Sequence, residues 1–426
     1  MSEVTDLLQQ LIRVDTTNPP GNETAAAELL RQYLEPAGVE CELIARVPER
    51  ANLVARLRGG DGPTLALLSH TDVVLADAKE WERAPFDGEL VDGEVWGRGA
   101  LDMKGQVAAS AVALASLARE GARPPGDVIF IAAADEEVGD GFGLSWLCEQ
   151  HPEAVRADFS VNEGAGDRLD VRGRGVWLCA TAEKMTAPFT LRVHGRSGHA
   201  SMPGIADNAL LKAAPLIERL GAYVPEPRLE PEVEALLRAV AADVPTDPRQ
   251  LLAFARGIDP LLGALVEPLL ALTFAPTMIE ASQKRNVIPA VCEVEIDSRL
   301  LPGQTVAEQQ EIARTALGPG EYELVPGEHQ GGTRSPLDTT LWDSIAAFVA
   351  VEDSEGVVAP VCVSGFTDSH WLRDAFDTVA YGFFPARTMP VEQAAMLIHS
   401  ANERVPVEDL ELGVRFLRHV VQNYAG

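Results

Sequence analysis

Short apolar runs alternate with helical patterns along the first third of the chain, and this alternation decides the class of fold. The runs TLALLSH (64–70) and DVIFIAAA (127–134) have the length and composition of strands buried on both faces. Between them, GQVAASAVALASLAREG has the length and small apolar residues of a helix that ends at Gly121. Strands that alternate with helices predict an α/β fold, in which helices cover a mostly parallel sheet.

A different pattern begins near Lys184. The segment PFTLRVHG alternates apolar and polar residues, as a strand covered on one face does, and an amphipathic helical pattern follows it. A second strand and helix pattern (291–318) completes a small α+β sandwich, and the buried pattern returns after Pro336. The predicted domains of this 426-residue chain are a catalytic domain in two segments, residues 1–185 and 331–426, and an inserted domain, residues 186–330.

The charge balance excludes several kinds of partner. The chain has 64 Asp and Glu against 35 Lys and Arg, and its formal net charge of −29 repels nucleic-acid phosphates and anionic lipid. No segment reaches the ~20 consecutive apolar residues of a membrane-spanning helix, and the first residues carry no cationic leader. We therefore expect a soluble, cytoplasmic protein with no nucleic-acid or membrane partner.

The cysteines argue against a disulfide framework and against a thiolate zinc site. They are odd in number, widely scattered and never spaced as CxxC. We expect most of them to be buried as small apolar side chains. The five positions are Cys41, Cys148, Cys179, Cys292 and Cys362.

Residues that can bind metals follow several of the predicted strands. In open α/β sheets, ligands bind beyond the carboxyl ends of the strands, so polar residues just after apolar runs are candidates for a site. A further acid lies in the glycine-flanked turn WGRGALDMKG, and a further histidine lies near the C-terminus. The candidates are His70, Asp72, Asp102, Asp135, Glu136, Glu137, Glu163 and His399.

Taken singly, each candidate has a simpler explanation. A lone histidine such as His70 is more often solvated or hydrogen-bonded than a ligand, and Glu136 with Glu137 could form a charged loop. Together they are harder to dismiss, because like charges that converge in one crevice repel unless a cation neutralises them. Nitrogen and oxygen donors without thiolates suit Zn²⁺, Co²⁺ or Mn²⁺, and Asp102 could bridge two such ions. One of the two adjacent glutamates could then bind metal while the other accepts a proton from water.

With these residues assembled, the sequence resembles a metallopeptidase family over nearly its whole length. The family includes aminoacylase, glutamate carboxypeptidase, acetylornithine deacetylase, succinyl-diaminopimelate desuccinylase and carboxypeptidase S. The resemblance implies a two-metal hydrolase that cleaves an amide bond beside a free carboxylate of a small-molecule substrate. It rests on eight motifs in the family's order: SHTDVV, WERAPFDGELVDGEVWGRGALDMKG, ADEEVG, VNEGAG, GRSGHASMP, RNVIP with DSRLLPG, GFTDS and IHSANERV.

The resemblance also implies roles for single residues. Asp102 would bridge two ions, for which we expect Zn²⁺, with Co²⁺ or Mn²⁺ as alternatives. Glu136 matches the general base, and Asp72 matches an acid that orients the ligand histidine or tunes the base. The implied ligand sets are His70, Asp102 and Glu163 for one ion, and Asp102, Glu137 and His399 for the other.

Further matches concern the inserted domain, which the resemblance makes a lid and a dimerisation domain of a possible homodimer. His199 matches a histidine that stabilises the oxyanion from the neighbouring subunit, although it could also be a loop residue without a catalytic role. Asn286 and Arg299 match residues that hold the substrate, although Arg299 could equally form a salt bridge at a strand end. Gly382 is the one glycine present where relatives have a glycine-rich substrate loop.

The sequence does not determine the substrate. An N-acyl-amino acid and a dipeptide differ only on the acyl side of the amide, so the residues do not separate an aminoacylase from a carboxypeptidase or dipeptidase. A desuccinylase or deacetylase of a biosynthetic amino acid is an alternative, and desuccinylation would call for a further cationic pocket. A non-catalytic binding protein of the same fold is a second alternative, against which the complete ligand set and Glu136 argue.

Overall fold

The computed structural model describes residues 2–426, which form two compact units. The first unit comprises the residues up to Thr181 together with Arg334–Val361 and Thr367–Gly426. The second comprises Ala182–Thr333 and Cys362–Phe366. None of the helices within the described residues is long and apolar enough to cross a bilayer.

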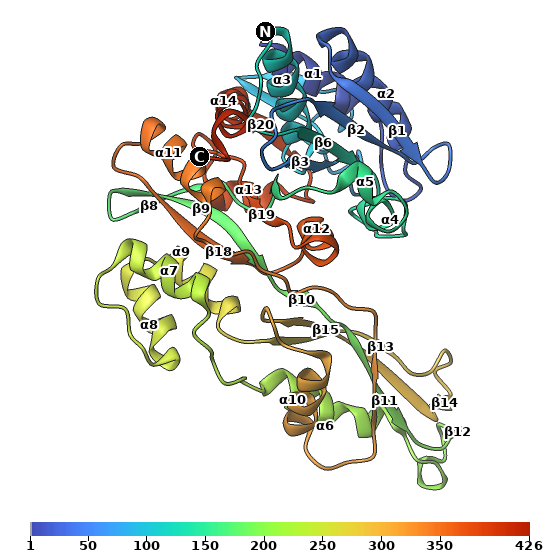
Figure 1. Ribbon diagram of the computed structural model, residues 1–426. Helices are drawn as coiled ribbons and strands as arrows, with labels where there is room; N and C mark the ends of the chain where they lie inside the picture. Colours follow the sequence, from blue (N-terminus) through green and yellow to red (C-terminus); the bar gives the residue numbers. More distant parts are fainter. Residues whose placement is uncertain (1) are drawn as a thin grey trace. The chain divides into compact units, whose positions relative to one another are not determined.

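A mixed sheet forms the centre of the first unit (Figure 1). The strands β6, β3, β7 and β19 run parallel in its middle, as the sequence pattern predicts, while β1 and β2 on one side and β9 on the other join antiparallel. In spatial order the strands are β1 (Glu40–Ala45), β2 (Ala51–Leu57), β6 (Val128–Ala133), β3 (Leu65–His70), β7 (Phe159–Asn162), β19 (Val379–Gly382), β9 (Arg174–Glu183) and β18 (Val357–Val363), with β8 (Arg168–Val171) beside β9.

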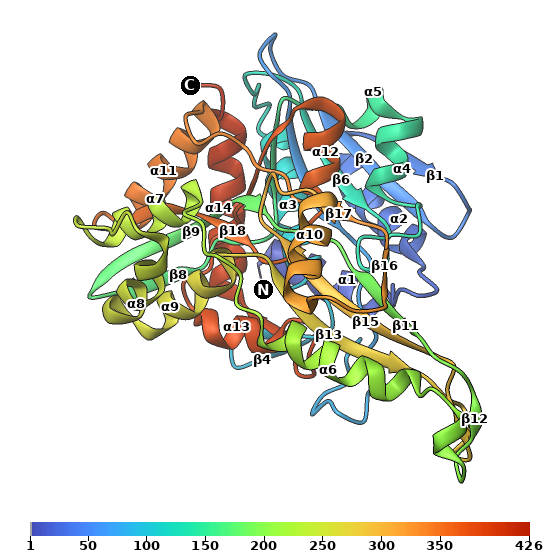
Figure 2. The ribbon, with the colours of Figure 1, turned by 90° about the horizontal axis from the view of Figure 1, so that it is seen from below.

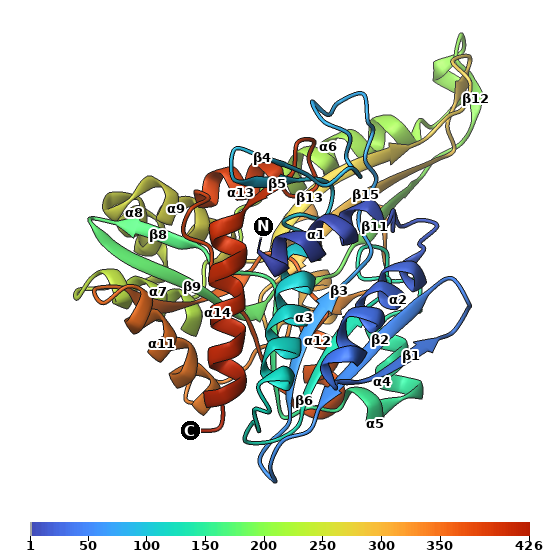
Figure 3. The ribbon, with the colours of Figure 1, turned by 90° about the horizontal axis from the view of Figure 1, so that it is seen from above.

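Helices cover both faces of this sheet because its central strands are apolar on both sides. Leu67 and Phe130 pack in one core, and their neighbours Leu68 and Ile131 pack in a second core on the other face. Figure 3 shows α1, α2, α3 and α14 side by side over the first core. The helices of that core are α1 (Glu3–Arg13), α2 (Glu23–Leu34), α3 (Lys104–Arg119), α11 (Thr340–Glu352) and α14 (Val407–Asn423); those of the second are α4 (Leu144–Gln150), α5 (Pro152–Val155) and α12 (Ser369–Phe376).

Parallel pairing brings the ends of three strands to one edge of the sheet. His70 at the end of β3 pairs with Ala133 at the end of β6, and β7 runs parallel to β3 on its other side. The residues that follow these strands therefore emerge together. A small sheet of β4 (Glu89–Val91), β5 (Glu94–Trp96) and β20 (Arg404–Pro406) and the short helix α13 (Val391–Leu397) complete the unit.

The second unit is an antiparallel sheet with two helices on one face (Figure 2). Its strand β11 shows the burial alternation that PFTLRVHG predicts, since Phe189, Leu191 and Val193 are buried. The main strands are β11 (Phe189–His194), β13 (Thr273–Glu280), β15 (Val291–Leu300) and β16 (Glu323–Pro326), and the helices are α6 (Ala209–Ala222) and α10 (Val306–Leu317). Short strands are β10 (Met185–Thr186), β12 (Gly198–His199), β14 (Val287–Ile288) and β17 (Gln330–Gly331).

Prolines start three further helices in this unit. Each has proline at its first helical position, where no backbone N–H is needed, and the side chains of Asp247 and Asp259 cap two of them. The helices are α7 (Pro231–Val240), α8 (Pro248–Ile258) and α9 (Pro260–Val266). Three 3₁₀ turns complete the chain: η1 (Glu35–Ala37), η2 (Pro203–Ile205) and η3 (Glu267–Leu269).

Candidate metal centre

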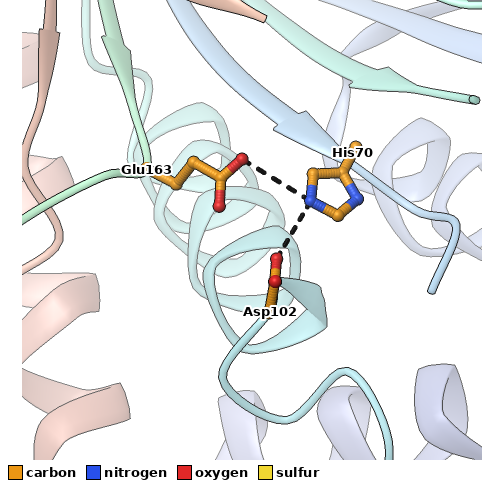
Figure 4. Close-up of side chains that lie close together, drawn as sticks. All are labelled: His70, Asp102 and Glu163. Atoms are coloured by element: carbon orange, nitrogen blue, oxygen red, sulfur yellow. Dashed lines mark hydrogen bonds and ion pairs between the residues drawn. The ribbon is translucent and has the colours of Figure 1, made fainter. Parts of the chain in front are cut away.

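His70 lies at the centre of a group of carboxylates at the edge of the first unit's sheet (Figure 4). Its ring is buried, with Nε2 3.1 Å from Oδ1 of Asp102 and 3.6 Å from Oε1 of Glu163. On the other side of the ring, Nδ1 lies 3.1 Å from the carbonyl oxygen of Asp72. That contact fixes the ring so that Nε2 faces the two acids.

Asp102 joins this group to a second one. While its Oδ1 faces His70, its Oδ2 lies 3.0 Å from Nε2 of His399, which is also 3.2 Å from Oε2 of Glu137. One donor atom from each of His70, Asp102 and Glu163 lies within 4.8 Å of the others, and the same is true of Asp102, Glu137 and His399. The structure therefore brings all five expected ligands together as two groups that share one aspartate.

The charge state of these groups fits a pair of cations. Burial and the neighbouring charge of Asp102 raise the pKa of Glu163 to about 8. Burial favours the neutral form of Asp102, but hydrogen bonds from His399 and His70 lower its pKa below the usual range. The hydrogen bonds that His399 makes with Asp102 and Glu137 raise the pKa of His399 to about 10. Carboxylates and imidazoles bind divalent cations in their deprotonated forms, so metal binding at these groups would release protons.

Asp72 shapes the turn that carries the two adjacent glutamates. Its side chain is fully buried, and its two oxygens accept the backbone N–H groups of Glu136 and Glu137, each at 3.1 Å. One oxygen also accepts a hydrogen bond from Asn18 at 2.9 Å. The side chain of Glu137 reaches His399, whereas burial raises the pKa of Glu136 well above its usual range. The two glutamates therefore have different surroundings, as the sequence pattern predicts.

Asp135 follows the same strand but takes no part in either group. Its backbone is left-handed, with φ of 66°, and its Oδ1 accepts hydrogen bonds from Asn18 at 3.1 Å and Arg50 at 3.2 Å. Arg50 is buried and paired through two nitrogens with Glu23, which is itself buried. The sequence analysis missed Asn18, Arg50 and Glu23, because isolated polar residues near the N-terminus carry no signal of a buried network.

Glu403 is a further residue that the sequence analysis missed. It is fully buried, and its Oε1 accepts the backbone N–H groups of Leu101 at 2.7 Å and Asp102 at 3.0 Å. Its Oε2 accepts the N–H of Gly99 at 3.0 Å and Nη1 of Arg98 at 2.7 Å. The C-terminal motif IHSANERV thus supplies both His399 and the carboxylate that holds the Asp102 turn, and the place of Glu403 in that motif was its signal.

We expect Glu403→Gln to weaken metal binding. The amide nitrogen of glutamine cannot accept a hydrogen bond, so it would oppose either the backbone N–H groups or Arg98. Breaking a buried ion pair costs about 3–5 kcal/mol of stability, and losing a residue that orients a ligand costs about 10–100-fold in metal affinity. Chelator competition on the folded protein measures the second effect apart from the first. Wild-type metal affinity in this variant would contradict the positioning role.

Three expected site residues lie in the second unit. His199 is exposed, with Nδ1 2.7 Å from the hydroxyl of Ser201. Asn286 is exposed too, and its carbonyl accepts the N–H of Ala200 at 3.0 Å. Arg299 forms two hydrogen bonds with Asp297, at 2.9 and 3.0 Å, so the salt bridge that the sequence left open is present. Their contact with a substrate stays a prediction.

Gly382 ends β19 beside Asn162, the residue before Glu163. A Cβ at Gly382 would lie 2.0 Å from the carbonyl oxygen of Glu163, so only glycine permits this close approach. The glycine therefore lets the strand that precedes Glu163 pack against β19. Its expected substrate contact stays a prediction.

A sheet edge that gathers histidines and carboxylates in two groups around one shared aspartate is the arrangement of a two-metal hydrolase. The comparisons with known proteins agree. The chain belongs to the peptidase family M20/M25/M40, whose model matches residues 66–423. It is a metal-dependent hydrolase of that family, and the resemblance in its motifs is confirmed.

Similar proteins span the whole chain. The N-fatty-acyl-amino acid synthase/hydrolase PM20D1 of Homo sapiens is 28% identical, over 97% of this chain and 86% of its own length. The succinyl-diaminopimelate desuccinylase of Cereibacter sphaeroides is 29% identical, over 98% of both chains. An M20 family metallo-carboxypeptidase of Sulfolobus solfataricus shares the fold, with a TM-score of 0.75 at 20% identity over 100% of both chains. The predicted α/β class is therefore confirmed.

Proposed function

We propose that the protein hydrolyses an amide bond beside a free carboxylate, in an N-acyl-amino acid or a short peptide. One observation carries the proposal: the two oxygens of Asp102 face His70 and His399, each of which also faces a second carboxylate. We propose His70, Asp102 and Glu163 as the ligands of one ion and Asp102, Glu137 and His399 as those of the other, with Zn²⁺ first and Co²⁺ or Mn²⁺ as alternatives.

The chain's own residues divide the chemistry. When bound, two divalent ions supply Lewis acidity toward the amide carbonyl and make water more acidic. Glu136 takes the proton from the attacking water and passes it to the leaving amine. Asp72 keeps Glu136 in place through the backbone N–H that it accepts at 3.1 Å. We further propose that His199 stabilises the oxyanion, and that Asn286, Arg299 and Gly382 contact the substrate.

Hydrolysis by chelator-stripped protein tests this function. A panel of N-acyl-amino acids and dipeptides is supplied with Zn²⁺, Co²⁺ or Mn²⁺ added back in turn, and release of the free amino acid is measured. We expect release that depends on the metal. Protein that binds two ions but stays silent across the panel would instead support a ligand-binding protein of the same fold.

We propose that the second unit mediates a homodimer. Within the described residues, its strand β13 pairs only with β15 and so has an open edge. This strand exposes Met278 by 61% and Ile279 by 51%. We expect light scattering after size exclusion to give twice the mass of the chain, and Ile279→Glu to give the monomer mass. Val351→Glu, which places the same charge on the first unit where Val351 is 81% exposed, should stay dimeric. A monomeric wild type would contradict the proposal.

The cysteines support a proposed location in the cytoplasm. All five are free, and three of them are buried. Free thiols without a disulfide are typical of proteins in a reducing compartment. We propose no nucleic-acid or membrane partner, since a net charge of −29 opposes binding to nucleic-acid phosphates and to anionic lipid.

A further inference from the structure

A cavity of about 260 Å³ lies against two of the proposed metal ligands, Asp102 and Glu163. All of its lining residues belong to the first unit, and they come from the Asp102 turn, the segment after β7, and the segments around α13 and α14. Most of its lining residues other than the two ligands are apolar. The apolar side chains there include Leu101, Phe384, Met389, Ala394, Ile398 and Val405.

The charged side chains of the cavity are all acids. Among its lining residues, every one of which the structure describes, none is Lys, Arg or His. Besides the two proposed ligands it contains Asp167, whose pKa burial raises to about 6, and Asp409. Asp409 accepts the backbone N–H groups of Arg387, Thr388 and Met389 at 2.8–3.0 Å, so it is engaged in holding the cavity wall. A further carboxylate that reached Asp167 and Asp409, beyond the proposed ions, would meet like charge with no Lys, Arg or His in the lining to pair with it.

We propose that this cavity takes an uncharged, apolar group of the substrate and rejects an acidic one such as succinyl. The inference rests on the proposed function, and it distinguishes between the N-fatty-acyl-amino acid hydrolase and the desuccinylase among the similar proteins. At about 260 Å³ the cavity is just below the roughly 300–1,000 Å³ of sites that hold whole ligands, so it fits one arm of a substrate. Burial of that arm removes apolar surface from water.

The apolar arm belongs either to the acyl group or to the amino-acid side chain, since both flank the amide carbon and nitrogen. Two substrate series distinguish these positions. The first keeps glycine and varies the acyl group: N-acetyl, N-octanoyl and N-succinyl. The second keeps the acetyl group and varies the amino acid: glycine, leucine and glutamate. In each series the charged member and the apolar member are compared with the same small reference, N-acetylglycine.

We expect kcat/KM for the apolar member to exceed that for N-acetylglycine by at least about tenfold in one series, and the charged member to be the poorest substrate in that series. Ala394→Phe should then lower this ratio by about tenfold, because Ala394 is buried in the wall and a larger side chain fills the cavity. Ala395→Phe is the matched control: Ala395 is the next residue of α13, is exposed, and does not line the cavity.

The outcomes separate this inference from the function on which it rests. Preference for N-succinylglycine or N-acetylglutamate would overturn the inference while leaving amide hydrolysis established. The inference would also be overturned if the ratio of kcat/KM for the apolar substrate to that for N-acetylglycine changed equally in Ala394→Phe and Ala395→Phe, or changed in neither variant. Absence of metal-dependent hydrolysis across both series would overturn the proposed function and the inference with it. Dissociation constants measured on the Glu136→Gln background should follow the same apolar order, which checks binding without turnover.

Discussion

Glu136→Gln should abolish turnover while both metal ions stay bound. The substitution keeps the size of the side chain but removes the group that accepts the proton of water, and such general-base catalysis contributes about 10²–10⁴-fold to a rate. Glu136 belongs to neither group of expected ligands, and its backbone N–H remains available to Asp72. We therefore expect kcat to fall by about 10³-fold or more, with two metal ions per chain by elemental analysis.

Glu149→Gln gives the matched control for this change. Glu149 is an exposed residue of α4 in the same unit, so the same loss of one carboxylate should leave both turnover and metal content unchanged. Full activity in Glu136→Gln would refute its assignment as the base. Loss of one ion from that variant would instead identify Glu136 as a ligand.

Asp102→Ala should remove both metal ions at once. Its two oxygens face two different histidines, so one substitution deletes a donor from each of the two groups. Loss of a residue that only orients a ligand already costs about 10–100-fold in metal affinity, and loss of a shared ligand should cost more for both ions. We expect chelator competition to show more than about 100-fold weaker binding of each ion, and hydrolysis to fall to background.

The fold of Asp102→Ala should persist, because Glu403 accepts the backbone N–H of residue 102 and that bond survives the change. Asp61→Ala, at an exposed bend of the same unit, is the control and should bind two ions with wild-type affinity. If Asp102→Ala loses only one ion and keeps the other tightly, the shared-ligand assignment is wrong.

Local sequence patterns predicted those residues of the candidate metal centre that follow the parallel strands of the sheet. His70, the turn after Ala133 and Glu163 follow apolar runs, and parallel pairing of those runs places their ends together. The α/β class followed from the same runs. The antiparallel pairing of β2 with β6 and of β9 with β19 did not, since the direction of these strands depends on distant partners that periodicity along the chain does not encode.

The remaining site residues depend on contacts between segments far apart in the chain. Asp102 lies in a turn and His399 in a C-terminal segment, and only the family resemblance connected them before the structure brought them within 3.0 Å. The motif IHSANERV contained a signal for Glu403, but Arg50 escaped the sequence analysis for a related reason. A charged residue in a sequence is usually a solvated one, and its burial against a partner more than 80 positions away leaves no local pattern.

The order of the ligands along the chain has a consequence for synthesis. Four of the five expected ligands precede the second unit in sequence, while His399 and the supporting Glu403 follow it. A ribosome must therefore translate the whole of the second unit before the last ligand exists. A growing chain can fold its early strands. It cannot yet form the contact of Asp102 with His399, or the hydrogen bond from the backbone N–H of Asp102 to Glu403. If His399 is a ligand as proposed, we expect a chain that ends within the second unit to lack metal-dependent activity.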